Sequence, residues 1–241
     1  MKNLFKNLIF LIFISLISRH ALSEVKINFC LIKLELWGEK VRNEYKGINA
    51  EILEALAKKA NVKSNIIFAP YPRIIKNLST GVCDLTVTLP DPKAKGIEIG
   101  EKYWTIRMGI LPQKGFNVSS LNNLSGKRVG ELSKATLGPA YDGNNTFKRT
   151  KAAKYGNLVR MLKDKKVDAV AGDLDILQKV VTELNFETGS SFVVAPLPLH
   201  FMMSQKSKYK NRIQEFNKII VDLEKTGEIS KIVNSYFQKT I

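Results

Sequence analysis

The sequence predicts an α/β protein in which parallel strands alternate with helices. Short apolar segments alternate with amphipathic ones along most of the chain, which is typical of β-α-β units. The 241 residues are 44% hydrophobic, as expected of a globular chain long enough for one large domain or two small ones. The alternation runs through two successive groups of elements. We therefore expect two lobes, each with its own small sheet.

The N-terminal residues 1–23 have the layout of a secretory signal peptide. Lys2 and Lys6 precede an apolar run at 8–17, which is too short to cross a bilayer core of roughly 30 Å as a helix. The Ala-Leu-Ser sequence that follows at 21–23 has small residues at both positions that a signal peptidase reads. We expect cleavage after this sequence and export to the periplasm. An uncleaved membrane anchor is the alternative.

The formal net charge of +16 does not predict a nucleic-acid partner. Cleavage would remove three cations and no acid, which lowers the charge to +13. The remaining basic residues are mostly lysines scattered along the chain, without the aromatic-flanked basic motifs that stack bases. We expect a solvated, lysine-rich surface and no nucleic-acid binding. A preference for anionic partners is the alternative.

The first group of elements is predicted to be β-α-β-α-β. The segment 48–60 repeats apolar residues with the period of a helix. Pro72 lies in the first turn of the next helix, and Gly81 ends it. This order predicts a parallel sheet with helices on its faces. Strands are expected at 25–30, 64–69 and 84–89, and helices at 48–60 and 71–78.

The second group begins after a loop marked by proline and glycine. No long Gly/Ser linker separates the groups, so two lobes would have to be joined by strands. An amphipathic helix pair forms the tail. The expected strands or extended segments are 103–112, 128–132, 167–172, 192–199 and 201–204. The expected helices are a short turn within 121–127, one near 136, and 158–165, 174–184, 211–226 and 229–237.

The two cysteines are predicted to be free, buried thiols. Cys30 ends the first predicted strand and Cys83 begins the third. Parallel neighbours would place these ends at opposite edges, beyond the roughly 7 Å between Cα atoms that a disulfide allows. His200 is the one histidine after the predicted signal peptide. The sequence contains no metal-binding cluster, phosphate-binding loop or nucleophile elbow. We expect no catalytic residue, no metal and no cofactor.

Four motifs, taken in order, resemble a known family. The order and spacing are similar to those of family 3 of the bacterial periplasmic solute-binding proteins, the amino-acid-type, type II periplasmic binding proteins. The resemblance covers nearly all of the chain after the leader. The motifs are GINAEIL at 47–53, LSTGVCD at 78–84, LSGKRVG at 124–130 and a C-terminal helix pair at 222–236.

The resemblance implies two Rossmann-like α/β lobes joined by two hinge strands, near 105–108 and near 194–198. Lobe one would then comprise 24–105 and 197–241, and lobe two 106–196. The implied protein is a monomeric, non-enzymatic receptor in the periplasm. It would bind a small polar solute, either amino-acid-like or small and anionic or zwitterionic, in the cleft and deliver it to an ABC permease at the inner membrane. A ligand sensor that docks on a signalling protein and a dehydratase-type enzyme are the alternatives.

Candidate ligand-binding residues follow from the rule that ligands of open α/β sheets lie beyond the carboxyl ends of the strands. Trp37, after the first strand, could stack on a ligand or simply pack in lobe one. Tyr71 and Arg73 follow the second strand, and the arginine offers a fork of donors for a carboxylate or is a surface charge. Thr88 ends the third strand, where the family uses hydroxyl and backbone groups.

Three further candidates belong to the second group. Leu132 ends a strand. Thr136 stands at the spacing of the family's anion-binding turn, although an ordinary helix cap is the alternative. Asp173 stands where amino-acid binders carry an acid for the ligand ammonium, or it caps the next helix.

One departure from the family concerns the ligand carboxylate. The resemblance places an arginine in the loop after the third strand, where this chain has Ala94. Lys93 or Lys95 could supply a point charge, but not the bidentate fork of an arginine. Arg73 and Arg107 are further candidates for that charge.

Overall fold

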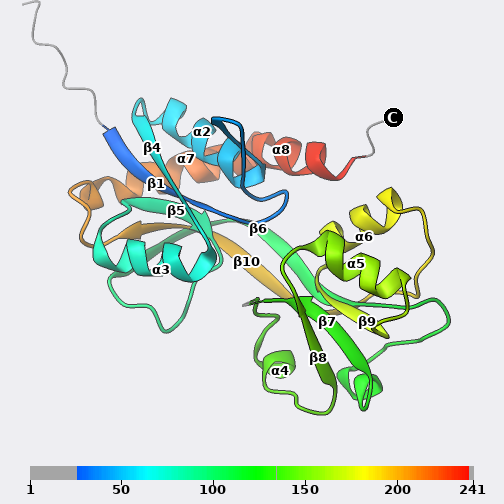
Figure 1. Ribbon diagram of the computed structural model, residues 1–241. Coiled ribbons are helices and arrows are strands. Elements are labelled where there is room, and N and C mark those ends of the chain that lie inside the picture. The colour runs from blue at the N-terminus through cyan, green and yellow to red at the C-terminus, as the bar shows by residue number, and fades with distance from the viewer. Residues whose placement is uncertain (1–25, 134, 239–241) are drawn as a thin grey trace, which may run out of the picture.

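The protein consists of two lobes connected by a pair of long strands (Figure 1). The computed structural model describes residues 26–133 and 135–238. The strands β6 (Ile97–Pro112) and β10 (Phe192–Ser204) run antiparallel to each other from one lobe into the other. The predicted signal peptide lies outside the described residues.

The expected pair of small sheets is instead one continuous sheet of eight strands, in the order β4-β1-β5-β10-β6-β9-β7-β8. β10 pairs with β5 on its first-lobe side, and β6 pairs with β9 on its second-lobe side. The two crossing strands therefore join the sheet halves by backbone hydrogen bonds. The segments predicted as hinges pair with each other in this ladder, with Ile106 opposite Leu197.

The first lobe contains the β-α-β-α-β order that the sequence predicts. Its strands β1, β4 and β5 are parallel. Helix α2 buries the apolar residues Ile52, Leu53 and Leu56 against this half of the sheet. The tail returns to the same lobe as two helices. The elements are β1 (Lys26–Ile32), α2 (Ile48–Lys59), β4 (Lys63–Ala69), α3 (Tyr71–Thr80), β5 (Leu85–Thr88), α7 (Ile213–Lys225) and α8 (Glu228–Phe237).

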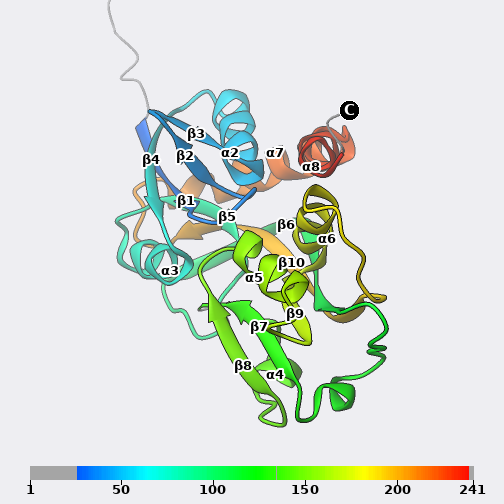
Figure 2. The ribbon, with the colours of Figure 1, turned by 45° about the vertical axis from the view of Figure 1, so that its right-hand side comes forward.

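The second lobe repeats the arrangement with three parallel neighbours, β8, β7 and β9. Helices α5 and α6 contact each other, and α6 also contacts α8 of the first lobe (Figure 2). The lobes thus meet at helices as well as through the crossing strands. The elements are η1 (Leu121–Leu124), β7 (Arg128–Leu132), α4 (Pro139–Asp142), β8 (Lys148–Ala152), α5 (Tyr155–Lys163), β9 (Ala169–Asp173) and α6 (Leu174–Glu183); η2 (Lys210–Arg212) precedes α7.

Three short strands were not expected from the sequence. The hairpin of β2 (Glu39–Val41) and β3 (Glu44–Lys46) and the edge strand β8 are mostly polar and exposed, so they lack an apolar pattern. The expected break between two strands near His200 is instead an irregularity in the β6–β10 register within one continuous strand. The unexpected strands are exposed, whereas the irregular register lies in the central pair of the sheet.

The prediction of two free thiols is wrong, because Cys30 and Cys83 form a disulfide with their Cα atoms 5.7 Å apart. β1 continues to Ile32, so Cys30 lies inside the strand and not at its end. Cys83 lies in the turn that leads into β5, where the amide of Asp84 bonds to the carbonyl of Asn28. The turn therefore brings the two cysteines alongside each other.

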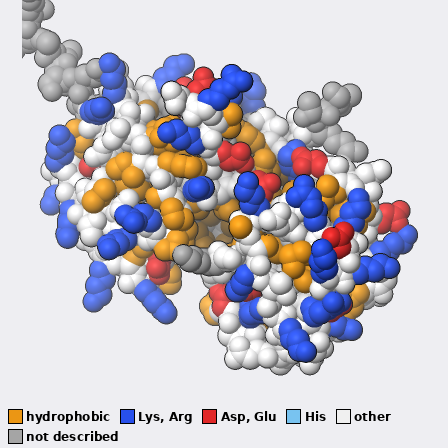
Figure 3. All heavy atoms as spheres, in the orientation of Figure 1, with side chains coloured by type: hydrophobic (Ala, Val, Ile, Leu, Met, Phe, Trp, Pro, Cys, Tyr) orange, Lys and Arg blue, Asp and Glu red, His pale blue; other side chains and the backbone are white. Residues whose placement is uncertain are grey.

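On the face shown in Figure 3, lysine and arginine side chains are scattered over both lobes among uncharged ones. In the part of the chain that the structure describes, none of the helices has the length and apolar character needed to cross a membrane.

Candidate functional site

A cavity of about 280 Å³ lies between the lobes, at the carboxyl ends of the strands. This volume is near the lower end of the usual range for small-ligand sites, roughly 300 to 1,000 Å³. Both crossing strands contribute to it. Most of its wall is apolar or aromatic, and its polar members are Lys33, Asn49, Thr88, Ser133, Thr136 and Asp173 together with the polar groups of Trp37, Tyr71 and Tyr155.

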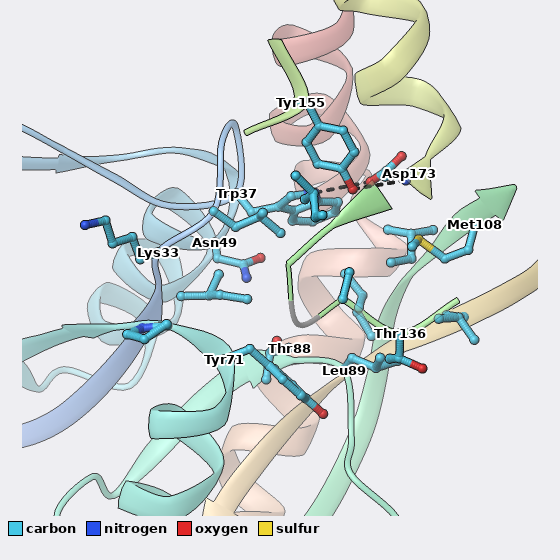
Figure 4. Close-up of a pocket in the computed structure, with 18 of the residues that line it drawn as sticks. Lys33, Trp37, Asn49, Tyr71, Thr88, Leu89, Met108, Thr136, Tyr155 and Asp173 are labelled. Carbon is cyan, nitrogen blue, oxygen red and sulfur yellow. Dashed lines mark hydrogen bonds between the residues drawn. The ribbon is translucent and has the colours of Figure 1, made fainter. Parts of the chain in front are cut away.

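Asp173 is the buried charged group in this lining. It ends β9, and the residue is 2% exposed. Oδ1 accepts a hydrogen bond from the amide of Asp175 at 3.0 Å, so Asp173 is also the N-cap of α6. Oδ2 accepts a hydrogen bond from Nε1 of Trp37 in the other lobe (Figure 4). The carboxylate thus combines the capping role with a position on the cavity wall.

The surroundings of Asp173 make its ionised form costly. Burial and the charge of Asp175 raise its pKa from 3.8 to about 6, although hydrogen bonds from Trp37 and two backbone amides act in the opposite direction. The amide of Asp173 donates to the hydroxyl of Tyr155 at 3.1 Å. Burial raises the pKa of Tyr155, and the charges of Asp173 and Glu35 raise it further. This end of the cavity is therefore negative in character.

A glycine makes room for the Tyr155 ring. Tyr155 is the first residue of α5 and is buried. A Cβ atom at Gly172 would lie 2.6 Å from Cε1 of that ring, which is closer than real contacts allow. Gly172 therefore lets the ring pack against β9 beside Asp173.

Two polar side chains of the first-lobe wall differ in whether they already form hydrogen bonds. Asn49 donates to the carbonyl of Val87 at 2.9 Å and accepts from the hydroxyl of Tyr103 at 2.9 Å, so its position is fixed. Thr88 is buried at the end of β5, and within the described residues its hydroxyl has no hydrogen-bond partner. This hydroxyl is available to a bound molecule.

Two longer side chains complete the first-lobe wall. In Figure 4, Tyr71 lies near Thr88 and Leu89. Burial and the charge of Asp91 raise the pKa of Tyr71 to about 12, so its phenol stays neutral. Lys33 is exposed, and its ammonium points away from the side of the cavity that holds Asp173 (Figure 4).

The turn that bears Thr136 is already occupied by a carboxylate of the same chain. The hydroxyl of Thr136 bonds to Oδ2 of Asp142, and the amide of Leu137 donates to Oδ1 of Asp142 at 3.1 Å. Thr136 does not cap a helix, since α4 has Gly138 as its N-cap. The donors predicted for an external anion thus bind an internal one.

Two of the eight predicted residues do not line the cavity. Arg73 follows Tyr71 by two positions on α3, so it is rotated by about 200° around the helix and is exposed. On β6, Ile106 and Met108 face the cavity and Arg107 between them faces the other side, where it forms an ion pair with Asp175. The other six predicted residues line it: Trp37, Tyr71, Thr88, Leu132, Thr136 and Asp173.

Sequence reasoning did not identify Lys33, Asn49 or Tyr155. Lys33 follows β1 directly, but the strand was expected to end earlier. Asn49 stands in the GINAEIL motif, and its burial in an apolar helix face was the available signal. Tyr155 follows β8, a strand without an apolar pattern. None of Lys93, Ala94 and Lys95 is in the lining. In residues 26–133 and 135–238, no three His, Cys, Asp or Glu side chains are placed to hold a metal ion.

Comparison with protein families gives a match over residues 38–239 to the bacterial extracellular solute-binding proteins, family 3. The chain is 26% identical over 206 residues to the arginine-binding extracellular protein ArtP of Bacillus subtilis (strain 168), covering 79% of this chain and 77% of that protein. It is 23% identical over 210 residues to a probable histidine-binding protein of Neisseria gonorrhoeae, covering 82% and 77%.

Among solved structures, the ligand-binding core of GluR0 in complex with L-glutamate superimposes with a TM-score of 0.76. The alignment covers 90% of this chain and all of that one, at 16% sequence identity. The predicted fold class, two α/β lobes joined by two strands, is confirmed by this likeness and by the sheet topology.

Proposed function

The chain belongs to the bacterial extracellular solute-binding proteins of family 3, and on that premise we propose that it binds a small amino-acid-like solute between its lobes and delivers it to an ABC importer. The observation that carries the proposal is the position of Asp173, a buried carboxylate on the wall of an interlobe cavity. A protonated amine of the solute would pair with it. The solute would thereby offset the cost of keeping this acid ionised away from water.

The remaining lining suits a solute of that size. Trp37 and Tyr155 present aromatic rings beside Asp173 and can stabilise an ammonium group through their π faces. The Thr88 hydroxyl supplies a polar contact from the first lobe. Residues from both lobes therefore contact the solute, so that bringing the lobes together completes its binding site.

Binding is proposed to favour a closed arrangement of the lobes. β6 and β10 are the two chain segments that cross between them, and their pairing is irregular between Val193 and Ala195 and again around His200. Such irregularities allow a strand pair to bend. A permease could then distinguish the closed, loaded protein from the open, empty one.

A thermal-shift screen tests the binding step. The protein would be heated with amino acids, polyamines, dicarboxylates or sugar acids, each in excess. A ligand present at 100 times its Kd adds about 2.7 kcal/mol to the free energy of unfolding, which raises the melting temperature measurably. We expect amine-bearing solutes to raise it. If no small solute does so, the proposed function is contradicted.

The delivery step has its own test. We propose that the mature chain is exported after removal of 1–23 and works in the periplasm as a monomer without catalytic activity. The Cys30–Cys83 disulfide is in keeping with an oxidising compartment. Crosslinking of the loaded protein to membranes should capture an ABC permease. Capture of a kinase or cyclase would favour the sensor alternative instead.

A further inference from the structure

We infer that the cavity recognises a monoamine with an apolar body, and that a carboxylate on that molecule contributes little to its affinity. The inference rests on the proposed function and specifies its ligand. Three features of the structure support it: the charges that face the cavity, the occupied anion turn, and the composition of the wall.

The charges favour a cation over an anion. Asp173 is buried on the wall and near a further acid, Asp175, and the charge of Glu35 acts on the neighbouring Tyr155. Arg107, which pairs with Asp175 and also acts on Asp173, lies outside the lining. Oε2 of Glu35 is buried and has no hydrogen-bond partner among the described residues. The cation within the described lining is Lys33, and its ammonium points away from Asp173. An ammonium group is therefore attracted to this end of the cavity, whereas among the residues that the structure describes no cationic side chain of the lining faces a carboxylate there.

The turn that could bind a carboxylate is filled from within. The Thr136 hydroxyl and the Leu137 amide both bond to Asp142. An external carboxylate would have to displace this internal one, which is tethered six residues away and present at high effective concentration. Arg107 is likewise engaged by Asp175. Two of the groups that the sequence suggested for an α-carboxylate, the turn at Thr136 and Arg107, are thus engaged by acids of the same chain.

The rest of the wall is suited to an apolar body. Beyond the polar groups, the cavity is bounded by aliphatic side chains from both crossing strands and both lobes. A second charge on the solute would lie against these side chains, and the aliphatic residues that the structure describes offer it no counter-ion, which is costly. These aliphatic residues include Leu34, Leu89, Ile106, Met108, Leu197 and Leu199.

Calorimetric titration with matched pairs tests the inference on the unaltered protein. The pairs are L-leucine with isoamylamine and L-phenylalanine with phenethylamine, which differ by the carboxylate. We expect the amine of each pair to bind within fivefold of the amino acid, and L-arginine to bind more weakly than either amino acid. A preference of more than fivefold for the amino acids, or tighter binding of L-arginine, would overturn the inference while the proposed function stands.

A second comparison uses a variant in which the carboxylate of Asp142 is removed from the turn that bears Thr136. Asp142→Ala should improve the binding of L-leucine at least threefold and leave isoamylamine unchanged, because it frees donors for a carboxylate only. Glu187→Ala is the control, since it removes an equal charge from an exposed site in the same lobe, where the acid pairs with Lys114. Equal effects of Asp142→Ala on both compounds would contradict the inference. Binding of dicarboxylates alone would overturn it too, whereas failure of every solute to bind would instead reject the proposed function.

Discussion

Nε1 of Trp37 lies 3.3 Å from Oδ2 of Asp173 and donates a hydrogen bond to it from one lobe to the other. Trp37 belongs to the loop after β1, and Asp173 ends β9, so the bond spans the cleft. Both side chains are buried. A single contact therefore couples the position of the lobes to the state of the acid that we propose binds the solute.

Tryptophan fluorescence should report this contact directly. The chain has two tryptophans, and Trp37 lines the cavity whereas Trp104 does not. In Trp104→Phe, addition of L-leucine should still change the emission of the remaining indole. In Trp37→Phe the change should disappear. Retention of the change in Trp37→Phe would show that the ligand does not reach this wall.

The affinity for an amine should increase with pH through about 6. The solute ammonium pairs with ionised Asp173, and the pKa of that acid is raised to about 6. At pH 5 only about one molecule in eleven carries the ionised form, so affinity should be roughly tenfold below its value at neutral pH. Calorimetric titration from pH 4.5 to 7.5 measures this directly.

The control for the pH dependence is Asp173→Asn, which should bind weakly and show no midpoint near pH 6. The contribution of Asp173 to the stability of the fold should change with pH in the opposite direction to the affinity. A pKa raised on folding means that Asp173 favours the folded state below its unfolded value of 3.8, and that this contribution is lost as pH rises through about 6. A wild-type affinity that is flat between pH 4.5 and 7.5 would exclude Asp173 as the partner of the amine.

Gly172→Ala should weaken solute binding about tenfold. The added Cβ would lie 2.6 Å from the Tyr155 ring, so the ring would have to move away from Asp173. Overpacking of this kind also costs about 1 to 3 kcal/mol of stability. Gly156→Ala is a matched control, because its Cβ would meet no atom closer than 3.8 Å in α5. Similar affinities for both variants, measured by calorimetry, would show that the position of Tyr155 is unimportant.

The Cys30–Cys83 disulfide should stabilise the first lobe. It closes a loop of 53 residues, for which chain entropy gives about 4 kcal/mol. Replacing both cysteines with alanine should lower the melting temperature by about 10 °C. Reductant should lower the melting temperature of the wild type and leave that of the variant unchanged. Detection of two free thiols by mass mapping without reductant would contradict the structure.

The sequence was sufficient for the elements that have a strong apolar period. Helix α2 and the parallel strands around it follow from that period, since burial of one face determines both the element and its partner. The polar edge strand β8 gave no such signal. Because β8 was not predicted, Tyr155, which begins α5 shortly after the carboxyl end of β8, was not predicted as a residue of the site.

The site was predictable in its location and less so in its chemistry. Strand ends identified Asp173 and Thr88 as residues of the cavity wall. The direction of a side chain depends on its exact position along a helix or strand. Arg73 points away from the cavity because of its rotation about α3. Arg107 points away because side chains alternate between the two faces along β6. The internal bond between Thr136 and Asp142 depends on the tertiary fold of a turn, which no local pattern specifies.

The central claim is that Asp173 pairs with the amine of a solute held between the lobes. Calorimetric titration of the wild type and Asp173→Asn with isoamylamine at pH 7.5 tests it most directly. The asparagine keeps the shape and a capping oxygen for α6, and it removes both the charge and the oxygen that accepts from Trp37. We predict a loss of affinity of at least a hundredfold with little change in melting temperature. Equal affinity in the two proteins would contradict the account.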